Sequence, residues 1–222
     1  LFSRVVTSDT PGDQATRLRD YVEDFQVEDE ALAAARTCGV ALGCAPIHPA
    51  GGAALRVLAT ALRARTVVEV GTGCGVSGLY LLRGMVADGV LTSIDVQPRY
   101  QEAARRAFTS AGVPAGRTRL IMGRGIDVLP RLADTAYDLL FVDTACADYP
   151  AYHEQGVRLL KPGGVIVFDN MLRDDGAAGP DVLGRDTVTL RALARAVRED
   201  ERLAAVLLPV GEGLLAAARR PN

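Results

Sequence analysis

The sequence predicts an α/β protein built on a doubly wound, mostly parallel β-sheet with helices on both faces. Three observations support this fold class. β-Branched and apolar runs alternate with stretches of helical periodicity, which is typical of repeated strand–helix–strand units. A glycine-rich turn joins the first of these runs to a helical stretch. The last two runs flank a short turn at residues 211–213, which indicates a C-terminal antiparallel hairpin.

The N-terminal quarter is predicted to be helical. Apolar residues recur at mostly helical spacing over residues 14–37, which indicates one or two amphipathic helices, and a further helical stretch covers residues 50–63. We expect residues 1–63 to form a helical cap on one domain that spans residues 1–222.

Strands and helices are then predicted in alternation. The first strand, residues 66–70, is a β-branched run closed by glycine. The next four strands are predicted at residues 91–96, 119–122, 139–143 and 165–168, and the helices at residues 99–110, 126–132, 149–160 and 185–199. The two hairpin strands follow at residues 203–210 and 214–219. The glycine-rich segment 176–184 is predicted to be a mobile loop.

The charged residues exclude several classes of protein. Acidic and basic residues nearly balance, at 27 and 25, and the formal net charge of −2 provides no dense basic face for nucleic acid. The only lysine is Lys161, in the segment Leu-Leu-Lys-Pro-Gly-Gly. Schiff-base enzymes, Walker-type ATPases and kinases need a lysine in other motifs, so these three classes are excluded.

Apolar runs and cysteines indicate a cytoplasmic protein with reduced thiols. No run of about 18 apolar residues predicts a membrane span, and we expect no secretory signal. The four cysteines form neither a Cys-x-x-Cys pair nor a dense disulfide framework. Two histidines are too few for a histidine-rich metal site.

The turn after the first strand, residues 71–78, brings backbone N–H groups to the start of a helix, where they can bind a ligand. It is not the dinucleotide fingerprint, because Val76 stands where that pattern needs glycine. Glu69, just before the turn, would repel a pyrophosphate but can attract an ammonium or sulfonium group. Asp95, at the end of the second strand, can accept both hydroxyls of a ribose. These features favour S-adenosylmethionine over NAD. The alternative is that the glycines serve only a tight turn.

Two later strands also end in oxygen-bearing side chains, at Asp143 and at Asp169-Asn170. The carboxyl ends of parallel strands face one crevice, so these side chains can converge with the glycine turn. Two carboxylates and an amide oxygen suit Mg²⁺, Mn²⁺ or Ca²⁺ and leave positions for water and substrate. A helix cap at Asp143 and a turn at Asp169 explain the same residues without a metal, and the spacing does not decide between the two.

Together these motifs resemble the cation-dependent O-methyltransferases related to catechol and caffeoyl-CoA O-methyltransferases, which include many bacterial members. The resemblance covers most of the chain. Its anchors are the segments 68–73, 93–95, 141–143 and 159–164, together with Ser77, Tyr149, Tyr152, Asp169 and Asn170.

The resemblance implies a Rossmann-like class I methyltransferase sheet and a homodimer. It implies transfer of a methyl group from S-adenosylmethionine to a hydroxyl of a small catechol-like or phenolic substrate, assisted by Mg²⁺, with Mn²⁺ or Ca²⁺ as alternatives. The segment 45–52 is expected near cofactor and substrate. The implied cofactor contacts are Glu69, Gly71, Thr72, Gly73, Ser77, Asp95, Gly125, Ile126 and Asp143, and the implied cation ligands are Asp143, Asp169 and Asn170.

Three places depart from the family pattern. Catechol-type members have polar groups near the adenine where this chain has Gly125 and Ile126, so we expect adenine contact there through backbone and apolar packing. The family's proton-accepting lysine, three residues after Asp143, is here Cys146, and an aromatic residue of the substrate wall is here Arg173. Asp143 and Cys146 are the candidate catalytic residues, and His48 and His153 are further candidates for a base. We expect His153 to face solvent. A cation that lowers the pKa of the substrate hydroxyl would make a strong base unnecessary.

Other functions remain open besides transfer to a small molecule. A hydroxylated nucleoside of tRNA is an alternative acceptor, although the near-neutral charge makes a nucleic-acid partner less favourable. A protein that binds S-adenosylmethionine without catalysis is a second alternative, suggested by the missing lysine. A nicotinamide-dependent oxidoreductase ranks last because of Glu69.

Overall fold

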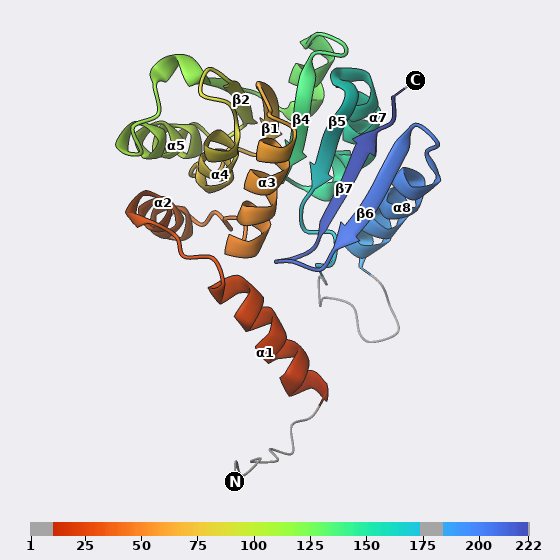
Figure 1. Ribbon diagram of the computed structural model, residues 1–222, viewed down its shortest axis with the longest axis horizontal. Coiled ribbons are helices and arrows are strands. Elements are labelled where there is room, and N and C mark those ends of the chain that lie inside the picture. Colours follow the sequence, from red (N-terminus) through yellow and green to blue (C-terminus); the bar gives the residue numbers. More distant parts are fainter. Residues whose placement is uncertain (1–10, 174–183, 222) are drawn as a thin grey trace.

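The computed structural model of the protein describes residues 11–173 and 184–221 (Figure 1). In this part of the chain a seven-stranded sheet has the order β3-β2-β1-β4-β5-β7-β6. Its first five members pair in parallel, and β7 and β6 complete it through antiparallel pairings. The strands are β1 (Thr66–Val70), β2 (Val90–Asp95), β3 (Thr118–Met122), β4 (Tyr137–Val142), β5 (Leu160–Phe168), β6 (Leu203–Leu208) and β7 (Leu214–Arg219). The predicted fold class, including the C-terminal hairpin, is confirmed.

Helices cover both faces of the sheet (Figure 1). The helices are α1 (Pro11–Asp24), α2 (Glu30–Ala41), α3 (Pro49–Ala61), α4 (Val76–Gly84), α5 (Pro98–Ser110), α6 (Gly125–Val128), α7 (Tyr149–Leu159) and α8 (Arg185–Glu199). Short 3-10 segments among the described residues are η1 (Ala115–Arg117), η2 (Leu129–Arg131) and η3 (Cys146–Asp148). Helices α2 to α5 pack on one face, and α7 and α8 pack on the other. Within the described ranges, every helix is too short or too polar to cross a membrane.

Strand β4 shows why the central strands are continuous apolar runs. Leu139 and Phe141 point into the core beneath α3 and α4, whereas Leu140 and Val142 point into the core beneath α7 and α8. All four side chains are fully buried. A strand covered on both faces has no solvent side on which polar residues would alternate.

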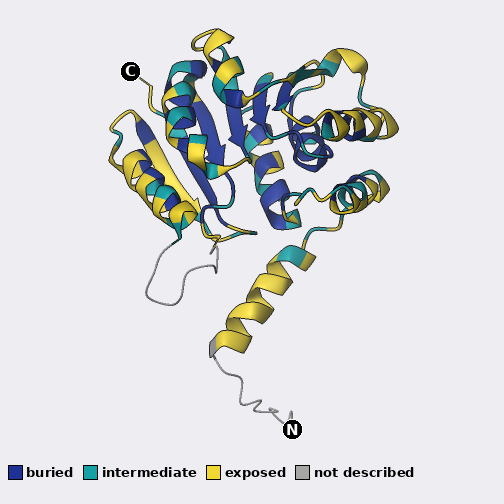
Figure 2. Ribbon diagram, turned by 180° about the vertical axis from the view of Figure 1, so that it is seen from behind, coloured by how far each residue is buried: buried dark blue, intermediate teal, exposed yellow. Residues whose placement is uncertain are grey.

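Helix α1 projects from the body and is mostly exposed (Figures 1 and 2). Leu18 of α1 and Phe25, which directly follows the helix, are 60% and 72% exposed. The carboxylate of Glu23 accepts the N–H groups of Ala50 at 2.9 Å and Gly211 at 3.0 Å. One acidic side chain therefore fixes the end of α1 against the start of α3 and the β6–β7 turn.

The expectation that His153 faces solvent is wrong. His153 is only 6% exposed, and its Nε2 lies 3.0 Å from Oδ2 of Asp200, which follows α8. Hydrogen bonds from the Arg202 guanidinium to Asp200 lower the pKa of that carboxyl to about 2. The imidazole is thus a structural partner of a buried carboxylate, and helical periodicity within residues 149–160 gave no sign of this distant contact.

Some of the predicted strand and helix boundaries differ from those in the structure. Strand β5 begins at Leu160, five residues before the predicted strand. The predicted helix at residues 126–132 is the short α6 followed by η2, because Pro130 has no N–H to continue helical bonding. The predicted loop at residues 176–184 lies outside the described residues except for Gly184.

The lone lysine has a structural position at the amino-terminal ends of three strands. Lys161 Nζ, on β5, donates to Asp138 Oδ1 on β4 at 2.7 Å. The other oxygen of Asp138 accepts the N–H groups of Arg65 at 2.7 Å and Thr66 at 2.8 Å, at the start of β1. Lys161 is therefore far from the carboxyl ends of the strands.

Candidate active site

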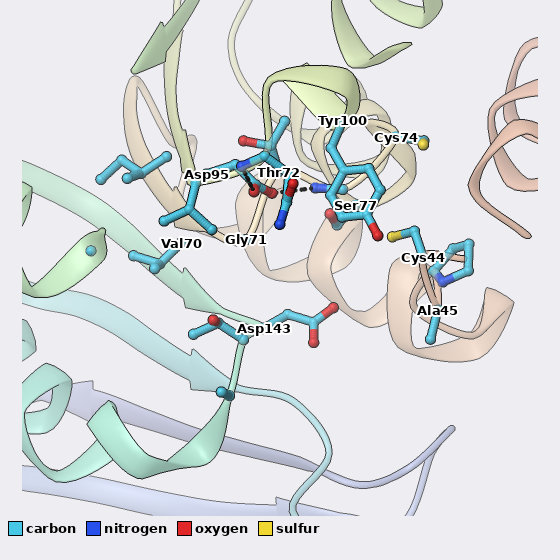
Figure 3. A pocket seen from close by; sticks show the side chains of 18 of the residues that line it. Cys44, Ala45, Val70, Gly71, Thr72, Cys74, Ser77, Asp95, Tyr100 and Asp143 are labelled. Carbon is cyan, nitrogen blue, oxygen red and sulfur yellow. Dashed lines mark hydrogen bonds between the residues drawn. The ribbon is translucent and has the colours of Figure 1, made fainter. Parts of the chain in front are cut away.

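A cavity of about 530 Å³ opens at the carboxyl ends of β1, β2 and β4 (Figure 3). The α2–α3 loop closes one side of it through Cys44, Ala45 and Ile47. This volume is typical of a site for a cofactor-sized ligand. The predicted cofactor residues that line the cavity are Gly71, Thr72, Gly73, Ser77, Asp95, Gly125 and Asp143.

The glycine turn between β1 and α4 depends on backbone conformations that side chains disfavour. Gly71, Gly73 and Gly75 have φ values of 99°, 49° and 90°. A Cβ atom at Gly71 would also overlap the backbone carbonyl of Asp143. The turn therefore brings the backbone close to the β4 end, and it begins α4 with N–H groups beside the cavity (Figure 3).

Glu69 lies behind the cavity wall and does not line the cavity. It is fully buried and accepts hydrogen bonds from Ser77 Oγ and Ser93 Oγ, both at 2.5 Å. Ser93 Oγ in turn lies 2.7 Å from Thr72 Oγ1. Burial raises the pKa of Glu69 to about 7 despite these bonds. The Glu69 carboxylate is thus connected to the cavity by hydrogen bonds, directly to Ser77 and through Ser93 to Thr72.

Asp95 faces the cavity from the end of β2 (Figure 3). Its Oδ2 accepts the Gly73 N–H at 3.0 Å and its Oδ1 accepts the Gln97 N–H at 2.8 Å. These bonds orient both oxygens, and each oxygen keeps a lone pair for a ligand hydroxyl.

Several residues of the cavity wall had no site role in the sequence motifs; among them are Gln97, Tyr100, Arg124 and Asp148, and also Tyr152, which served only as an anchor of the resemblance. The first two continue the chain beyond Asp95, where a polar residue and an aromatic residue close to a predicted ribose acceptor were an available signal. Arg124, Asp148 and Tyr152 are distant from the glycine turn in sequence and meet the cavity only in the folded chain. Tyr152, for example, packs against Gly125, with its Oη 2.8 Å from where a Cβ of Gly125 would be. Ile126, by contrast, does not line the cavity.

The acid cluster, which consists of Asp143, Asp169 and Asn170, adjoins the cavity at Asp143. Asn170 Nδ2 donates to Asp143 Oδ1 at 2.7 Å, and the Asn170 N–H donates to Asp169 Oδ1 at 2.7 Å. Asn170 adopts a left-handed conformation with φ of 63°. Burial raises the pKa of both carboxyls, and the charge of Asp143 raises that of Asp169 further. Asp143 lines the cavity, whereas Asp169 and Asn170 lie beside it.

The donor chemistry of this cluster fits a hard cation. Asp143, Asp169 and Asn170 offer carboxylate and amide oxygens, and the raised carboxyl pKa values mean that their negative charge lacks compensation. Across the described ranges, histidine, cysteine and acidic side chains do not gather in threes suited to a metal ion. A cation here would therefore need the amide oxygen of Asn170 as its third protein ligand.

The candidate bases do not reach into the cavity. Cys146 is half-buried, and burial together with the neighbouring carboxylate of Asp186 raises its pKa to about 11. A thiol in this environment stays protonated at neutral pH. His48 caps α3 and lies 3.9 Å from Glu212 Oε1 on the surface. Cys146, His48 and His153 do not line the cavity.

Comparison with known proteins adds a family match. Residues 28–220 match the family model described as O-methyltransferase. The chain is 51% identical over 206 residues to a candidate O-methyltransferase of Mycolicibacterium vanbaalenii, an alignment that covers 93% of this chain and 91% of the relative. It is 47% identical over 214 residues to a candidate O-methyltransferase of Mycobacteroides abscessus, covering 96% and 100% of the two chains.

Solved structures of other proteins share this fold over nearly the whole chain. A protein of Corynebacterium glutamicum superposes with a TM-score of 0.85 at 29% identity, covering 94% of this chain and 98% of that one. The O-methyltransferase TomG of Streptomyces achromogenes, involved in tomaymycin synthesis and solved in complex with S-adenosylmethionine, has a TM-score of 0.82 at 26% identity. That match covers 96% of this chain and 100% of TomG.

Proposed function

Because the chain belongs to the O-methyltransferase family and is an S-adenosylmethionine-dependent O-methyltransferase, we propose that it methylates a hydroxyl of a small catechol-like or phenolic substrate with the help of a divalent cation. The observation that supports this proposal best is the position of Asp143. Its side chain lines the cavity beside the glycine turn and also accepts a hydrogen bond from Asn170 of the acid cluster. One residue thus joins the proposed cofactor pocket to the proposed acceptor site.

For the cofactor, we propose that Asp95 accepts the ribose hydroxyls and that the glycine turn contacts the amino-acid part through its N–H groups. The two hydrogen bonds that orient Asp95 support the first contact. Ser77 lines the cavity while donating to Glu69, so the buried carboxylate can favour a positively charged ligand through it.

For the cation, we propose Asp143, Asp169 and Asn170 as the protein ligands. When bound, a divalent cation lowers the pKa of a coordinated hydroxyl and attracts two adjacent substrate oxygens. The residues themselves hold the acceptor near the cofactor, so that the substrate oxygen can attack the methyl carbon in line with the departing sulfur. S-adenosylhomocysteine then leaves, and the hydroxyl proton is lost to solvent.

The test is methyl transfer to catechol with protein freed of metal, assayed in EDTA and after addition of Mg²⁺. We expect activity to fall at least tenfold in EDTA and to return with Mg²⁺. Asp169→Asn should need more Mg²⁺ for half-maximal rate, whereas Glu102→Gln, an exposed residue paired with Arg106, serves as the matched control. Full activity in EDTA would refute the cation role. Absence of transfer to catechols and other phenols by a protein that binds S-adenosylhomocysteine would refute the substrate class.

We also propose that the enzyme is a homodimer. The exposed apolar side chains of Leu18 on α1 and of Phe25 just after it support an additional contact surface. Light scattering should give twice the chain mass of 23.4 kDa, and Phe25→Asp should shift the protein toward the monomer. A mass of one chain for the unmodified protein at working concentration would contradict this proposal.

A further inference from the structure

Three of the four cysteines gather beside the cavity. Cys38 lies on α2, Cys44 in the α2–α3 loop and Cys74 in the glycine turn, and all three are free thiols. Cys44 and Cys74 line the cavity, and Figure 3 shows them on the same side of it. The fourth, Cys146, lies apart from these three, next to Asp186.

Contacts between the end of α2, the α2–α3 loop and the glycine turn place the three cysteines near one another. The Cys44 N–H donates to the Gly39 carbonyl at 2.9 Å, which folds the loop back on the end of α2. Cys74 Cβ lies 3.7 Å from where a Cβ of Gly39 would be, and Cys44 Sγ lies 3.0 Å from the corresponding position at Gly73. The Cys38 thiol, next in sequence to Gly39, is hydrogen-bonded to that of Cys74. The contact between the two thiols, and the packing of Cys74 against the residue that follows Cys38, bring this pair close enough for a disulfide to be considered.

Cofactor chemistry does not explain this cluster. Cys74 is 3% exposed and Cys44 is half-buried, and burial raises the pKa of both thiols. They are therefore weak nucleophiles in the reduced protein, and methyl transfer to an oxygen does not need them. Cys38 is half-buried whereas Cys74 is buried, so within this pair Cys38 is the thiol that is more accessible to an oxidant from solvent.

We propose that Cys38 and Cys74 form an oxidisable thiol pair whose disulfide opposes cofactor binding; the second part rests on the proposed cofactor site. The oxidant is a hydroperoxide. The Cys38 sulfur attacks the terminal peroxide oxygen, an S–O bond forms as the O–O bond breaks, and hydrogen peroxide yields water and a sulfenic acid. The Cys74 sulfur then attacks the Cys38 sulfur, an S–S bond forms, and the hydroxyl leaves as a second water with the Cys74 proton. In sum, two thiols and one hydrogen peroxide give one disulfide and two waters.

The position of Cys74 couples this oxidation to the cavity. Cys74 stands between Gly73, whose N–H is bonded to Asp95, and Gly75, which begins α4. An S–S bond of about 2 Å draws Cys74 toward α2 and with it the N–H groups of the turn. Because linkage is reciprocal, a cofactor that prefers the reduced turn must also shift the thiol–disulfide equilibrium toward the reduced form.

The experiment treats the full chain with hydrogen peroxide, blocks remaining thiols, and measures the intact mass and the cross-linked peptides. We expect the loss of two hydrogens and a peptide joining Cys38 to Cys74. In a glutathione redox buffer at equilibrium, the oxidised fraction should be smaller with S-adenosylhomocysteine present. Cys38→Ser and Cys74→Ser should abolish the cross-link, while Cys146→Ser, the matched control, should retain it. Calorimetry should show that the oxidised protein binds S-adenosylhomocysteine weaker by on the order of tenfold, with recovery after reduction.

A cross-link between any other pair, a bond between two chains, or no cross-link in the unmodified protein overturns the thiol pair. Equal affinity of oxidised and reduced protein overturns the coupling. The mass measurement requires neither a methyl acceptor nor a cation, so it stands even if the proposed substrate class fails. If reduced protein does not bind S-adenosylhomocysteine, the proposed cofactor site fails, and the coupling is overturned with it.

Discussion

Replacement of Glu69 by glutamine tests the electrostatics behind the cavity wall. Glu69 is fully buried, and its two oxygens accept from Ser77 and Ser93 at 2.5 Å. Glutamine has nearly the same shape. Its oxygen can accept from one serine and its amide can donate to the other, so Glu69→Gln removes the charge while keeping the hydrogen-bonding groups paired.

The expected size of the effect follows from the pKa of Glu69, which burial raises from 4.5 to about 7. Between these values the folded protein binds more protons than the unfolded chain, so its stability falls as the pH rises and is constant above about pH 7. At about 1.4 kcal/mol per pH unit, the total loss is about 3 kcal/mol. Glu69→Gln should therefore be more stable than the unmodified protein by about 2 to 3 kcal/mol at pH 8, but by only about 1 kcal/mol at pH 5.

Urea unfolding at pH 5, 6, 7 and 8 measures this difference, with Glu102→Gln as the exposed control. The control should differ from the unmodified protein by less than about 0.5 kcal/mol throughout. Binding of S-adenosylhomocysteine to Glu69→Gln should weaken by on the order of tenfold, because hydrogen bonds to a charged group are the stronger ones. If the stability advantage of Glu69→Gln is the same at pH 5 and pH 8, the reasoning about the buried charge is wrong.

Three further substitutions test separate parts of the structure. Gly71→Ala places a Cβ against the Asp143 carbonyl at a φ of 99°, so calorimetry should detect at least tenfold weaker binding of S-adenosylhomocysteine; unchanged binding would contradict the close approach. His153→Ala removes the ring partner of Asp200 and should cost about 2 kcal/mol in urea unfolding at pH 7, and a loss below about 0.5 kcal/mol would place the ring at the surface after all. Cys146→Ser should change the rate of methyl transfer less than about threefold, whereas removal of a general base costs on the order of 100-fold or more. A large loss, with a shifted pH profile, would restore Cys146 as the base.

The order of strands and helices could be predicted because it depends on local pattern. Continuous apolar runs with helical stretches between them identify buried parallel strands, and the turns at residues 71–78 and 211–213 identify how two of them end. The strand order in space could not be derived in this way. It depends on which apolar faces pack best over the whole sheet, and no single segment records that.

The position of the site could be predicted from the sequence, but the burial of its individual side chains could not. Glu69, Asp95 and Asp143 lie at or just beyond the carboxyl ends of parallel strands, so topology brings them to one edge of the sheet. The burial of Glu69 behind Ser77 depends on Ser93 from the neighbouring strand, which the turn motif does not contain. The His153 prediction failed for the same reason, because its partner lies 47 residues further along the chain.

The pairing of Lys161 with Asp138 has a mechanical consequence. Together with the backbone of Arg65 and Thr66, this pair clamps β1, β4 and β5 at their amino-terminal ends. The glycine turn, Asp143 and Asp169 all extend from the opposite ends of these strands. We therefore expect any adjustment to a bound ligand to take place at the carboxyl ends of these strands. Amide hydrogens beside Lys161 and Asp138 should be among the slowest in the protein to exchange with solvent.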